Sequence, residues 1–277
     1  MTPFSTIKPL SLREQVAEQI RTAIIEGQLK PNDHITEATL TQRLGVSRTP
    51  VREALILLER EALIVFHPNR GCFVRAFTPR DVADLFSMRT ALENFAAECV
   101  LEHLTPADFD ALDASIHQQA QHSAHGDFKR VRSTDMAFHQ YLVNASQHPL
   151  LMRNWQEIVA QIAAVLYLRA DANPDYDENL ALADHRRIVQ AYRGRDLAAV
   201  QAENRRINAR VARECQLAVA KLQAGIPASK ATRRTAQRLQ AGTSVPHASP
   251  VHHGSRTAAH ADAPAENDWR PRMGEEI

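Results

Sequence analysis

Three residues in the middle of the chain have the types and spacing of a metal-binding or ligand-binding cluster. Asp135 and His139 are four residues apart, so on a helix both side chains face the same point. His185 lies on a later helical segment and can converge on them inside a helical bundle. A carboxylate and two imidazoles form a suitable ligand set for Zn²⁺, Ni²⁺ or Mn²⁺. Two alternatives stay open: a metal-free pocket that hydrogen-bonds a metabolite, and a structural polar cluster without a ligand.

Arg89 is also unusual, because it lies in the middle of a predicted helix among large apolar side chains. A guanidinium in the core of a bundle binds a carboxylate with two parallel hydrogen bonds. One interpretation is that Arg89 joins the three residues above in binding an effector, and the family resemblance given below favours it. The alternative is an ion pair within the helix, with Glu93 four residues later. Arg132 and Arg169 are further candidates for the pocket, but the sequence does not distinguish them from arginines on the surface.

A different chemistry is indicated near the N-terminus, where Ser47 begins a short helical pattern. Arg48, Thr49 and Arg52 lie off the apolar face of this helix, at its N-terminal end. Arginine reads guanine O6 and N7 with two hydrogen bonds, and a helix N-terminus in the major groove presents such side chains to base edges. The alternative is a solvated face on which the arginines pair with Glu53. The apolar face consists of Val51, Ala54, Leu55 and Leu58.

Two helices before this one must position it. Ser11 and Thr36 are of the residue type that caps helix N-termini, and each precedes an apolar stripe with helical spacing. Gly27 and Gly45 are placed to end the two helices. The second helix, the turn at Gly45 and the helix that Ser47 begins have the form of a DNA-binding helix-turn-helix.

A small hairpin is predicted to follow the three helices. Apolar or β-branched runs at 63–66 and 72–74 flank a polar tip that contains Arg70 and Gly71. Three helices followed by a hairpin make a winged helix-turn-helix. At the tip of the wing, Arg70 can reach a phosphate or a minor groove, and Gly71 permits close approach of the backbone.

The rest of the patterned sequence predicts helices with short connections, which is typical of an antiparallel bundle. The predicted helices span about 79–103, 106–124, 127–145, 149–170, 177–193 and 196–222. The predicted fold class is therefore mainly α, with an N-terminal winged helix-turn-helix and a C-terminal antiparallel all-α helical bundle.

These patterns also predict how the chain is divided. The N-terminal arm and the tail lack apolar periodicity, and the tail is rich in Pro, Ser, Gly, His and Ala, a composition typical of disorder. The predicted parts are a flexible arm (1–10), a winged helix-turn-helix domain (11–76), a linker (77–80), an effector-binding and dimerisation domain (81–223) and a disordered tail (224–277).

Composition excludes several classes of protein. The 277 residues are enough for two domains, and the net charge of +1 leaves a local basic face possible. The three cysteines are far apart and form no CxxC pair, which argues against a zinc ribbon and a disulfide framework. No apolar run approaches the roughly 20 residues that cross a membrane, and no signal peptide is evident. We therefore expect a cytoplasmic protein that does not bind membranes.

The stretch SLREQVAEQIRTAIIEGQLKPNDHITEATLTQRLGVSRTPVREALILLEREALI resembles the N-terminal domain of GntR-type bacterial transcription regulators, and PNRGCFV resembles their wing. The segments DLFSMRTALE, STDMAFHQYL and LADHRRIVQAYRGRD resemble the FCD effector domain of the FadR branch of that family. The resemblance covers about residues 10–222. It implies a homodimer that binds a palindromic operator in double-stranded DNA and is released or rearranged by a small metabolite, usually a carboxylate.

The resemblance also assigns roles to residues of the DNA-binding part. It makes Arg48 and Arg52 the main base readers. It makes Ser47 and Thr49 phosphate contacts at the start of the helix, and it makes the pair Arg70–Gly71 the contact at the wing tip.

For the bundle, the resemblance implies a metal site made of an Asp, a His four residues later and two further histidines. The first three positions correspond to Asp135, His139 and His185. The fourth position holds Ile207, and its neighbour Asn208 projects about 100° away around the helix. A divalent metal (Zn²⁺, Ni²⁺ or Mn²⁺) therefore requires water or the effector to complete its coordination.

We expect a dimeric transcription regulator without enzymatic activity, a repressor of metabolic genes that a small organic acid controls. Two alternatives belong to other classes. One is a metal-dependent hydrolase that uses the Asp/His cluster, for which no further Glu or His is obviously placed as a general base. The other is an architectural DNA-binding protein whose bundle serves only to dimerise.

Overall fold

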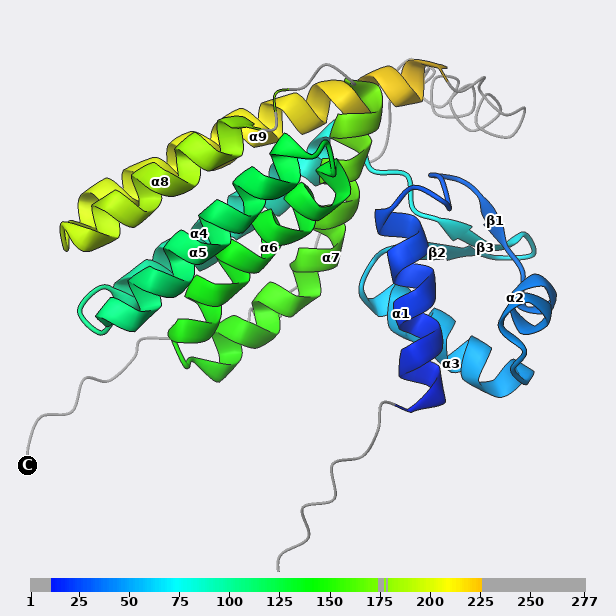
Figure 1. Ribbon diagram of the computed structural model, residues 1–277. Helices are drawn as coiled ribbons and strands as arrows, with labels where there is room; N and C mark the ends of the chain where they lie inside the picture. Colours follow the sequence, from blue (N-terminus) through cyan, green and yellow to red (C-terminus); the bar gives the residue numbers. More distant parts are fainter. Residues whose placement is uncertain (1–10, 174–176, 178, 226–277) are drawn as a thin grey trace, which may run out of the picture. The chain divides into compact units, whose positions relative to one another are not determined.

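The computed structural model describes residues 11–173, 177 and 179–225. Within them the chain forms a small winged part, followed by a set of long helices (Figure 1). The predicted fold class, mainly α with a winged helix-turn-helix and a helical bundle, is confirmed. The predicted arm (1–10) and nearly all of the predicted tail (224–277) lie outside the described residues.

The winged part contains three helices and three short strands. Helices α1 and α2 both pack against α3, and α3 also contacts β2. The residues of α3 predicted to form its apolar face are all buried: Val51, Ala54, Leu55 and Leu58. The elements are α1 (Leu12–Ile25), β1 (His34–Ile35), α2 (Glu37–Leu44), α3 (Arg48–Arg60), β2 (Ile64–His67) and β3 (Gly71–Val74).

Local sequence explains the turn between α2 and α3. The hydroxyl of Thr36 accepts a hydrogen bond from the backbone N–H of Thr39, which caps the start of α2. Gly45 ends α2 with a φ of 67°, a left-handed conformation that glycine adopts without a steric cost. Ser47 occupies the N-cap position of α3 as predicted, but its side chain makes no capping hydrogen bond.

The strands form an antiparallel sheet in the order β1–β3–β2. The predicted hairpin is present, with Ile64 opposite Val74 and His67 opposite Gly71. The third strand, β1, was not predicted, because its two residues are too few to show a period-two pattern. It pairs with β3 through His34 opposite Phe73.

The remaining described helices form the bundle. Helix α4 packs against α6, α7 and α9, while α5 packs against α6 and α8. A capping box between Thr78 and Asp81 begins α4 as predicted. Helix α4 ends at Val100 rather than at residue 103, and α9 extends to Gly225. The elements are α4 (Pro79–Val100), α5 (Pro106–Ala124), α6 (Phe128–Ala145), α7 (Pro149–Ala172), α8 (Asn179–Arg193) and α9 (Leu197–Gly225).

The core of the bundle contains an unusual number of buried polar side chains. Apolar residues such as Trp155, Phe138 and Tyr192 are almost fully buried, as expected. Buried polar groups are costly unless they are hydrogen-bonded or paired, so their concentration in the bundle marks a candidate site. Those residues are Arg89, Glu93, Gln119, Thr134, His139, Arg169, Asp184, His185, Asn204 and Asn208. None of the described helices is both long enough and apolar enough to span a bilayer.

Candidate DNA-reading surface and polar pocket

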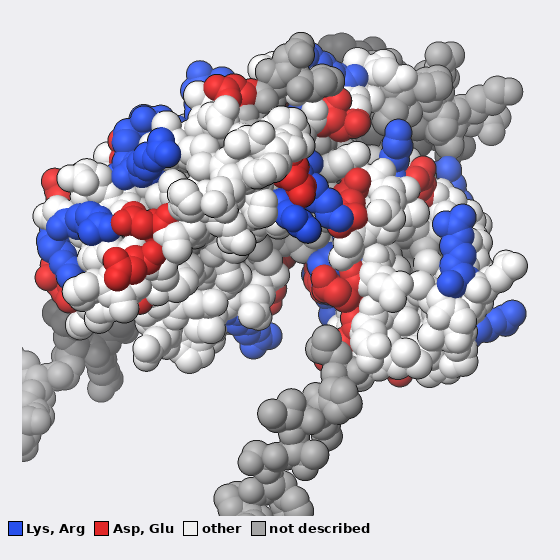
Figure 2. Space-filling view, viewed as in Figure 1, with Lys and Arg blue, Asp and Glu red and all other residues white. Residues whose placement is uncertain are grey.

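The start of α3 presents the residues predicted to read DNA. Ser47, Arg48, Thr49 and Arg52 are all exposed, and we call them the reading surface. In the view of Figure 2, basic side chains stand on the side of the winged part where α2 and the strands lie. Since the apolar face of α3 is buried against the winged part, the reading surface lies on its solvent side.

Arg52 has a partner that the sequence did not indicate. Its Nε donates hydrogen bonds to both carboxylate oxygens of Glu37 on α2, at 2.7 and 2.8 Å. This bond raises the pKa of the Arg52 guanidinium. The alternative partner, Glu53, is not bonded to Arg52. The terminal amino groups of Arg52 donate no hydrogen bond to any described residue, so they remain available for a base edge.

The wing tip contains Arg70 and Gly71, both exposed. Gly71 has a φ of 93°, and a Cβ atom at this position would lie 2.7 Å from Nε2 of His34. The backbone here therefore requires glycine. His34 belongs to β1, so the unpredicted strand contributes to the shape of the wing.

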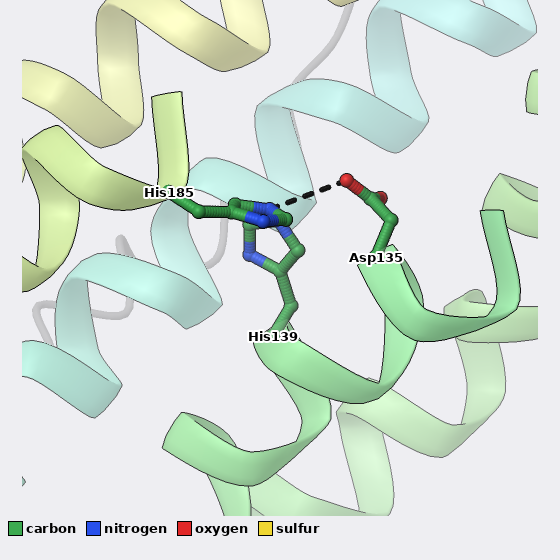
Figure 3. Close-up of side chains that lie close together, drawn as sticks. All are labelled: Asp135, His139 and His185. Carbon is green, nitrogen blue, oxygen red and sulfur yellow. Dashed lines mark hydrogen bonds and ion pairs between the residues drawn. The ribbon is translucent and has the colours of Figure 1, made fainter. Parts of the chain in front are cut away.

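In the bundle, the predicted cluster comes together. Asp135 and His139 project from α6, and His185 projects from α8 toward both (Figure 3). Nε2 of His185 lies 3.2 Å from Oδ1 of Asp135 and 3.3 Å from Nε2 of His139. Both imidazoles are buried, and the Asp135 side chain is 17% exposed. These three residues are the one group of possible metal ligands within the described part of the chain.

The outer nitrogen of each imidazole is held by a second residue. Nδ1 of His139 lies 2.9 Å from Oε1 of Glu93 on α4, and Nδ1 of His185 lies 2.9 Å from Oε1 of Gln119 on α5. The amide of Gln119 is oriented by its own Nε2, which donates to the carbonyl of Val131 at 3.5 Å. Gln119 therefore presents its carbonyl oxygen Oε1 as an acceptor to His185. This orientation makes Nδ1 of His185 the donor.

The same reasoning assigns the hydrogen of His139. Burial raises the pKa of Glu93, but the charge of Arg89 and the hydrogen bonds from Arg89 and His139 outweigh burial and lower this pKa to about 2. Glu93 is thus ionised and only accepts, so Nδ1 of His139 is the donor. Burial, together with the charge of Arg89, lowers the pKa of His139, which favours its neutral form.

A cation fits this arrangement. Nε2 of His185 faces both Nε2 of His139 and the carboxylate of Asp135, while the two Nδ1 atoms point away, to Gln119 and Glu93. Three electron-pair donors this close repel one another unless a proton or a metal ion lies between them. Metal-binding histidines usually donate their other ring N–H to a carboxylate or carbonyl oxygen, as Glu93 and Gln119 allow here. The residues present therefore suit a divalent metal.

Arg89 both forms the ion pair with Glu93 and lies in the candidate pocket, the two alternatives that the sequence left open. Its Nε donates to Oε1 of Glu93 at 2.8 Å, so the ion pair within the helix exists. The pair is buried rather than solvated, with Arg89 only 2% exposed. Arg89 also lines the same cavity as Asp135, His139 and His185, and we call these four residues the polar pocket.

The expected fourth ligand position is apolar. Ile207, which the family resemblance places at the fourth ligand position, is buried on α9 and lines the cavity. Its neighbour Asn208 does not face the imidazoles; Nδ2 of Asn208 donates to Oε2 of Glu93 at 2.7 Å. Ile207 has no donor atom, and Oδ1 of Asn208 is buried without a hydrogen-bond partner among the described residues.

Three more arginines line the cavity, whose volume is about 30 Å³. Arg132 and Arg169 had been considered from sequence, whereas Arg210 had not. Arg169 and Arg210 both bond Glu214, at 3.2 and 2.8 Å. Two aspartates, Asp135 and Asp184, line the cavity as well, so the cavity combines positive and negative side chains.

Sequence reasoning missed Gln119, although a signal was present. The apolar residues Phe109, Leu112 and Ile116 form the buried stripe of α5 at helical spacing, and Gln119 continues that stripe. A polar residue on an apolar stripe needs a buried partner, which here is His185. Glu93 lies on the buried stripe of α4 in the same way.

Two family models match separate parts of the chain. Residues 12–74 match the family described as "Bacterial regulatory proteins, gntR family", and residues 84–210 match the FCD domain. The first match contains the reading surface and the wing tip, and the second contains the polar pocket.

Similar proteins are transcription regulators. The HTH-type transcriptional regulator YdhC of Bacillus subtilis is 26% identical over 205 residues, covering 73% of this chain and 89% of YdhC. The gluconate operon transcriptional repressor of the same organism is 26% identical over 203 residues, covering 71% and 82%. The solved structure of McbR/YncC from Escherichia coli has the same fold, with a TM-score of 0.65 and 22% identity over 78% of this chain and all of that one.

Proposed function

The chain belongs to the GntR family of transcription regulators and carries an FCD domain. We propose that it is a repressor whose affinity for DNA is controlled by a small carboxylate bound in the polar pocket. The observation that carries this proposal is the convergence of Arg89, Asp135, His139 and His185 on one cavity inside the bundle. A folded domain rarely buries so many ionisable side chains without a function for them.

On the DNA side, we assign base reading to Arg48 and Arg52, with Ser47 and Thr49 on the phosphates. The hydroxyl of Ser47 makes no capping bond, so it is available to a phosphate at the helix N-terminus. Arg70 and Gly71 make the contact at the wing tip. The protein acts as a homodimer on double-stranded operator DNA in the cytoplasm, with one reading surface for each half-site.

On the effector side, Asp135, His139 and His185 hold a divalent metal such as Zn²⁺, Ni²⁺ or Mn²⁺. When bound, this ion supplies a Lewis-acid centre for an oxygen atom of the effector. Arg89 receives the carboxylate, while Glu93 and Gln119 keep the two imidazoles oriented. Binding favours one arrangement of the two winged domains of the dimer, so a difference in affinity between arrangements sets the response.

The experiment compares a duplex selected in vitro from random sequences with a scrambled duplex at physiological salt. We expect the selected duplex to bind at least about 1,000-fold more tightly. Equal binding would support the architectural alternative instead. Turnover of a hydrolysable substrate that stops on chelation would support the hydrolase.

A thermal-shift screen then tests control by an effector. Organic acids are added to the purified protein with and without chelator, and stabilisation should grow as RT ln(1 + [L]/Kd) for a ligand of the native state. We expect acids that stabilise the protein to change operator binding in the mobility-shift assay, and to lose their effect after chelation. Acids that never alter operator binding would contradict effector control.

A further inference from the structure

The outer face of the wing carries a row of aromatic side chains to which the proposed function gives no role. Phe73 on the central strand β3 is flanked by His34 on β1 and His67 on β2. The ring centroids of His34 and Phe73 are 4.8 Å apart with their planes at 30°, which is a stacked arrangement. Both imidazoles are exposed, so this row lies on the solvent side of the sheet. Cys72 and Val74, which alternate with Phe73 along β3, face the core instead.

His34 also covers the backbone of the wing tip. A Cβ atom at Gly71 would lie 2.7 Å from Nε2 of His34, and the three heavy atoms nearest to that Cβ, apart from those of Gly71 and its chain neighbours, all belong to this imidazole. The ring of His34 therefore rests against the bare Cα of Gly71 and against Phe73 at the same time. Glycine has no side chain to restrict its own backbone, so its conformation here depends on such outside contacts. His34 thus restrains the residue next to Arg70.

The same short segment reaches the proposed base reader. β1 leads directly into α2 (Figure 1), and the first residue of α2, Glu37, accepts two hydrogen bonds from Nε of Arg52. On its other side the segment is joined to β3, because the backbone N–H of Val74 donates to the carbonyl of Asp33 at 2.9 Å. His34 and Glu37 are three positions apart in the sequence. One short segment therefore contacts both the wing tip and the guanidinium of Arg52.

A protein that reads DNA with a helix and a wing must hold the two at a set distance. The groove that the helix enters and the phosphates that the wing contacts lie at fixed places on the duplex, and phosphate contacts fix the register of the protein. A rigid segment between the two contacts can set that distance. In this segment, His34 is the side chain that meets the wing tip.

We propose that His34 is a positioning residue for the DNA contact of the wing tip. Its imidazole, packed against Gly71 and Phe73, keeps Arg70 at a fixed distance from the reading surface. His34 acts through the wing and does not itself contact DNA. The proposal rests on the function proposed above, because it requires the wing tip to contact the operator.

The first test needs no DNA. Nitrogen NMR relaxation of the full chain gives the order parameter of each backbone amide. We expect His34→Ala to lower the order parameter of Gly71 to below about 0.6, the range of flexible backbone, and to leave that of Gly45 in the other turn unchanged. His34→Phe keeps a flat ring beside Phe73 and should retain the order of the unaltered protein. His117→Ala, which removes an exposed histidine of α5, is the control.

The second test locates the effect on DNA. Hydroxyl-radical footprinting on the selected duplex shows which sugars the protein covers, and Arg70→Ala identifies the protection that the wing tip causes. We expect His34→Ala to lose this protection and to keep that of the reading surface. Its affinity should fall about two- to tenfold, as the loss of one aromatic pair predicts. His34→Phe should keep both protections and the affinity.

Two results would overturn the inference directly. The first is a folded His34→Ala variant in which either the order parameter of Gly71 or the wing-tip protection is unchanged. The second is a His34→Phe variant that binds DNA as weakly as His34→Ala, with both lowering the salt slope of log K by about 1, because the imidazole would then contact a phosphate itself. His34→Asn, which also lacks the large ring, replaces His34→Ala if that variant does not fold.

Failure of the proposed function has a different signature. If Arg70→Ala leaves both the footprint and the affinity of the protein unchanged, the proposed wing-tip contact is wrong, and this inference fails with it. Base reading by Arg52 is tested separately, with the selected and scrambled duplexes. A lost wing-tip contact therefore cannot be confused with a lost positioning role, which leaves the effect of Arg70→Ala in place.

Discussion

The carboxylate of Glu37 accepts both of its close hydrogen bonds from Nε of Arg52, at 2.7 and 2.8 Å. The pair joins the two helices of the helix-turn-helix across its turn. It occupies one nitrogen of the guanidinium and leaves the two terminal amino groups for a base edge. Glu37 thus restrains the guanidinium of the proposed base reader through its Nε.

The first prediction concerns Arg52 itself. Arg52→Ala should weaken binding to the selected duplex by about tenfold or more while changing binding to a scrambled duplex much less, because only the base contact is specific. The measurement is a mobility-shift titration with both duplexes. Arg80→Ala, which removes an exposed arginine of α4 that is paired with Asp84, is the control. Unchanged affinity for the selected duplex would rule out base reading by Arg52.

The second prediction concerns the orientation of Arg52. Glu37→Gln removes the negative charge but keeps an oxygen acceptor, so Arg52 becomes less constrained and the region becomes more basic. We expect tighter binding to scrambled DNA and a ratio of selected to scrambled affinity that falls by about two- to fivefold, as suits an exposed ion pair. Fluorescence anisotropy at several salt concentrations measures both affinities. Glu53→Gln on α3 is the matched control, and an equal effect of both changes would contradict an orienting role.

The third prediction concerns the polar pocket. Glu93→Gln should reduce metal affinity by about 10- to 100-fold, because the ionised carboxylate orients His139 and strengthens it as a donor. Competition with a chromophoric chelator measures this affinity. Glu98→Gln, on the same helix but at an exposed position, should leave it unchanged. Nitrogen NMR of the histidine rings distinguishes a lost orientation of His139 from unfolding of the variant. In folded Glu93→Gln, we expect His139 to lose its preference for a hydrogen on Nδ1.

The fourth prediction concerns the stability of the winged part. Leu55 is 2% exposed and its neighbour Ile56 is 47% exposed on the same helix. Leu55→Ala should destabilise the native state by about 2–5 kcal/mol, because it leaves a cavity in the core. Ile56→Ala should cost much less, because that side chain is half in water already. Denaturant titration gives both free energies of unfolding, and similar losses for the two variants would contradict the packing described for α3.

The local features of this fold could be read from the sequence. The apolar spacing of Val51, Ala54 and Leu58 predicts the buried face of α3, and its outer face then carries Arg48 and Arg52. The spacing of Asp135 and His139 likewise places both on one face of α6. These predictions succeed because the helical period is a local property of the backbone, so residues three or four apart share a face whatever packs against them.

Tertiary structure alone decided the partners. His185 is 46 residues from His139 and 66 from Gln119, and Glu37 is 15 residues from Arg52. No periodic pattern carries that information, because such contacts depend on how whole helices pack. Resemblance to a family indicated that His185 joins the cluster, but it gave no sign of Gln119 or Glu37. The sequence therefore determined which side chains this protein turns inward or outward, and helix packing decided which of them meet.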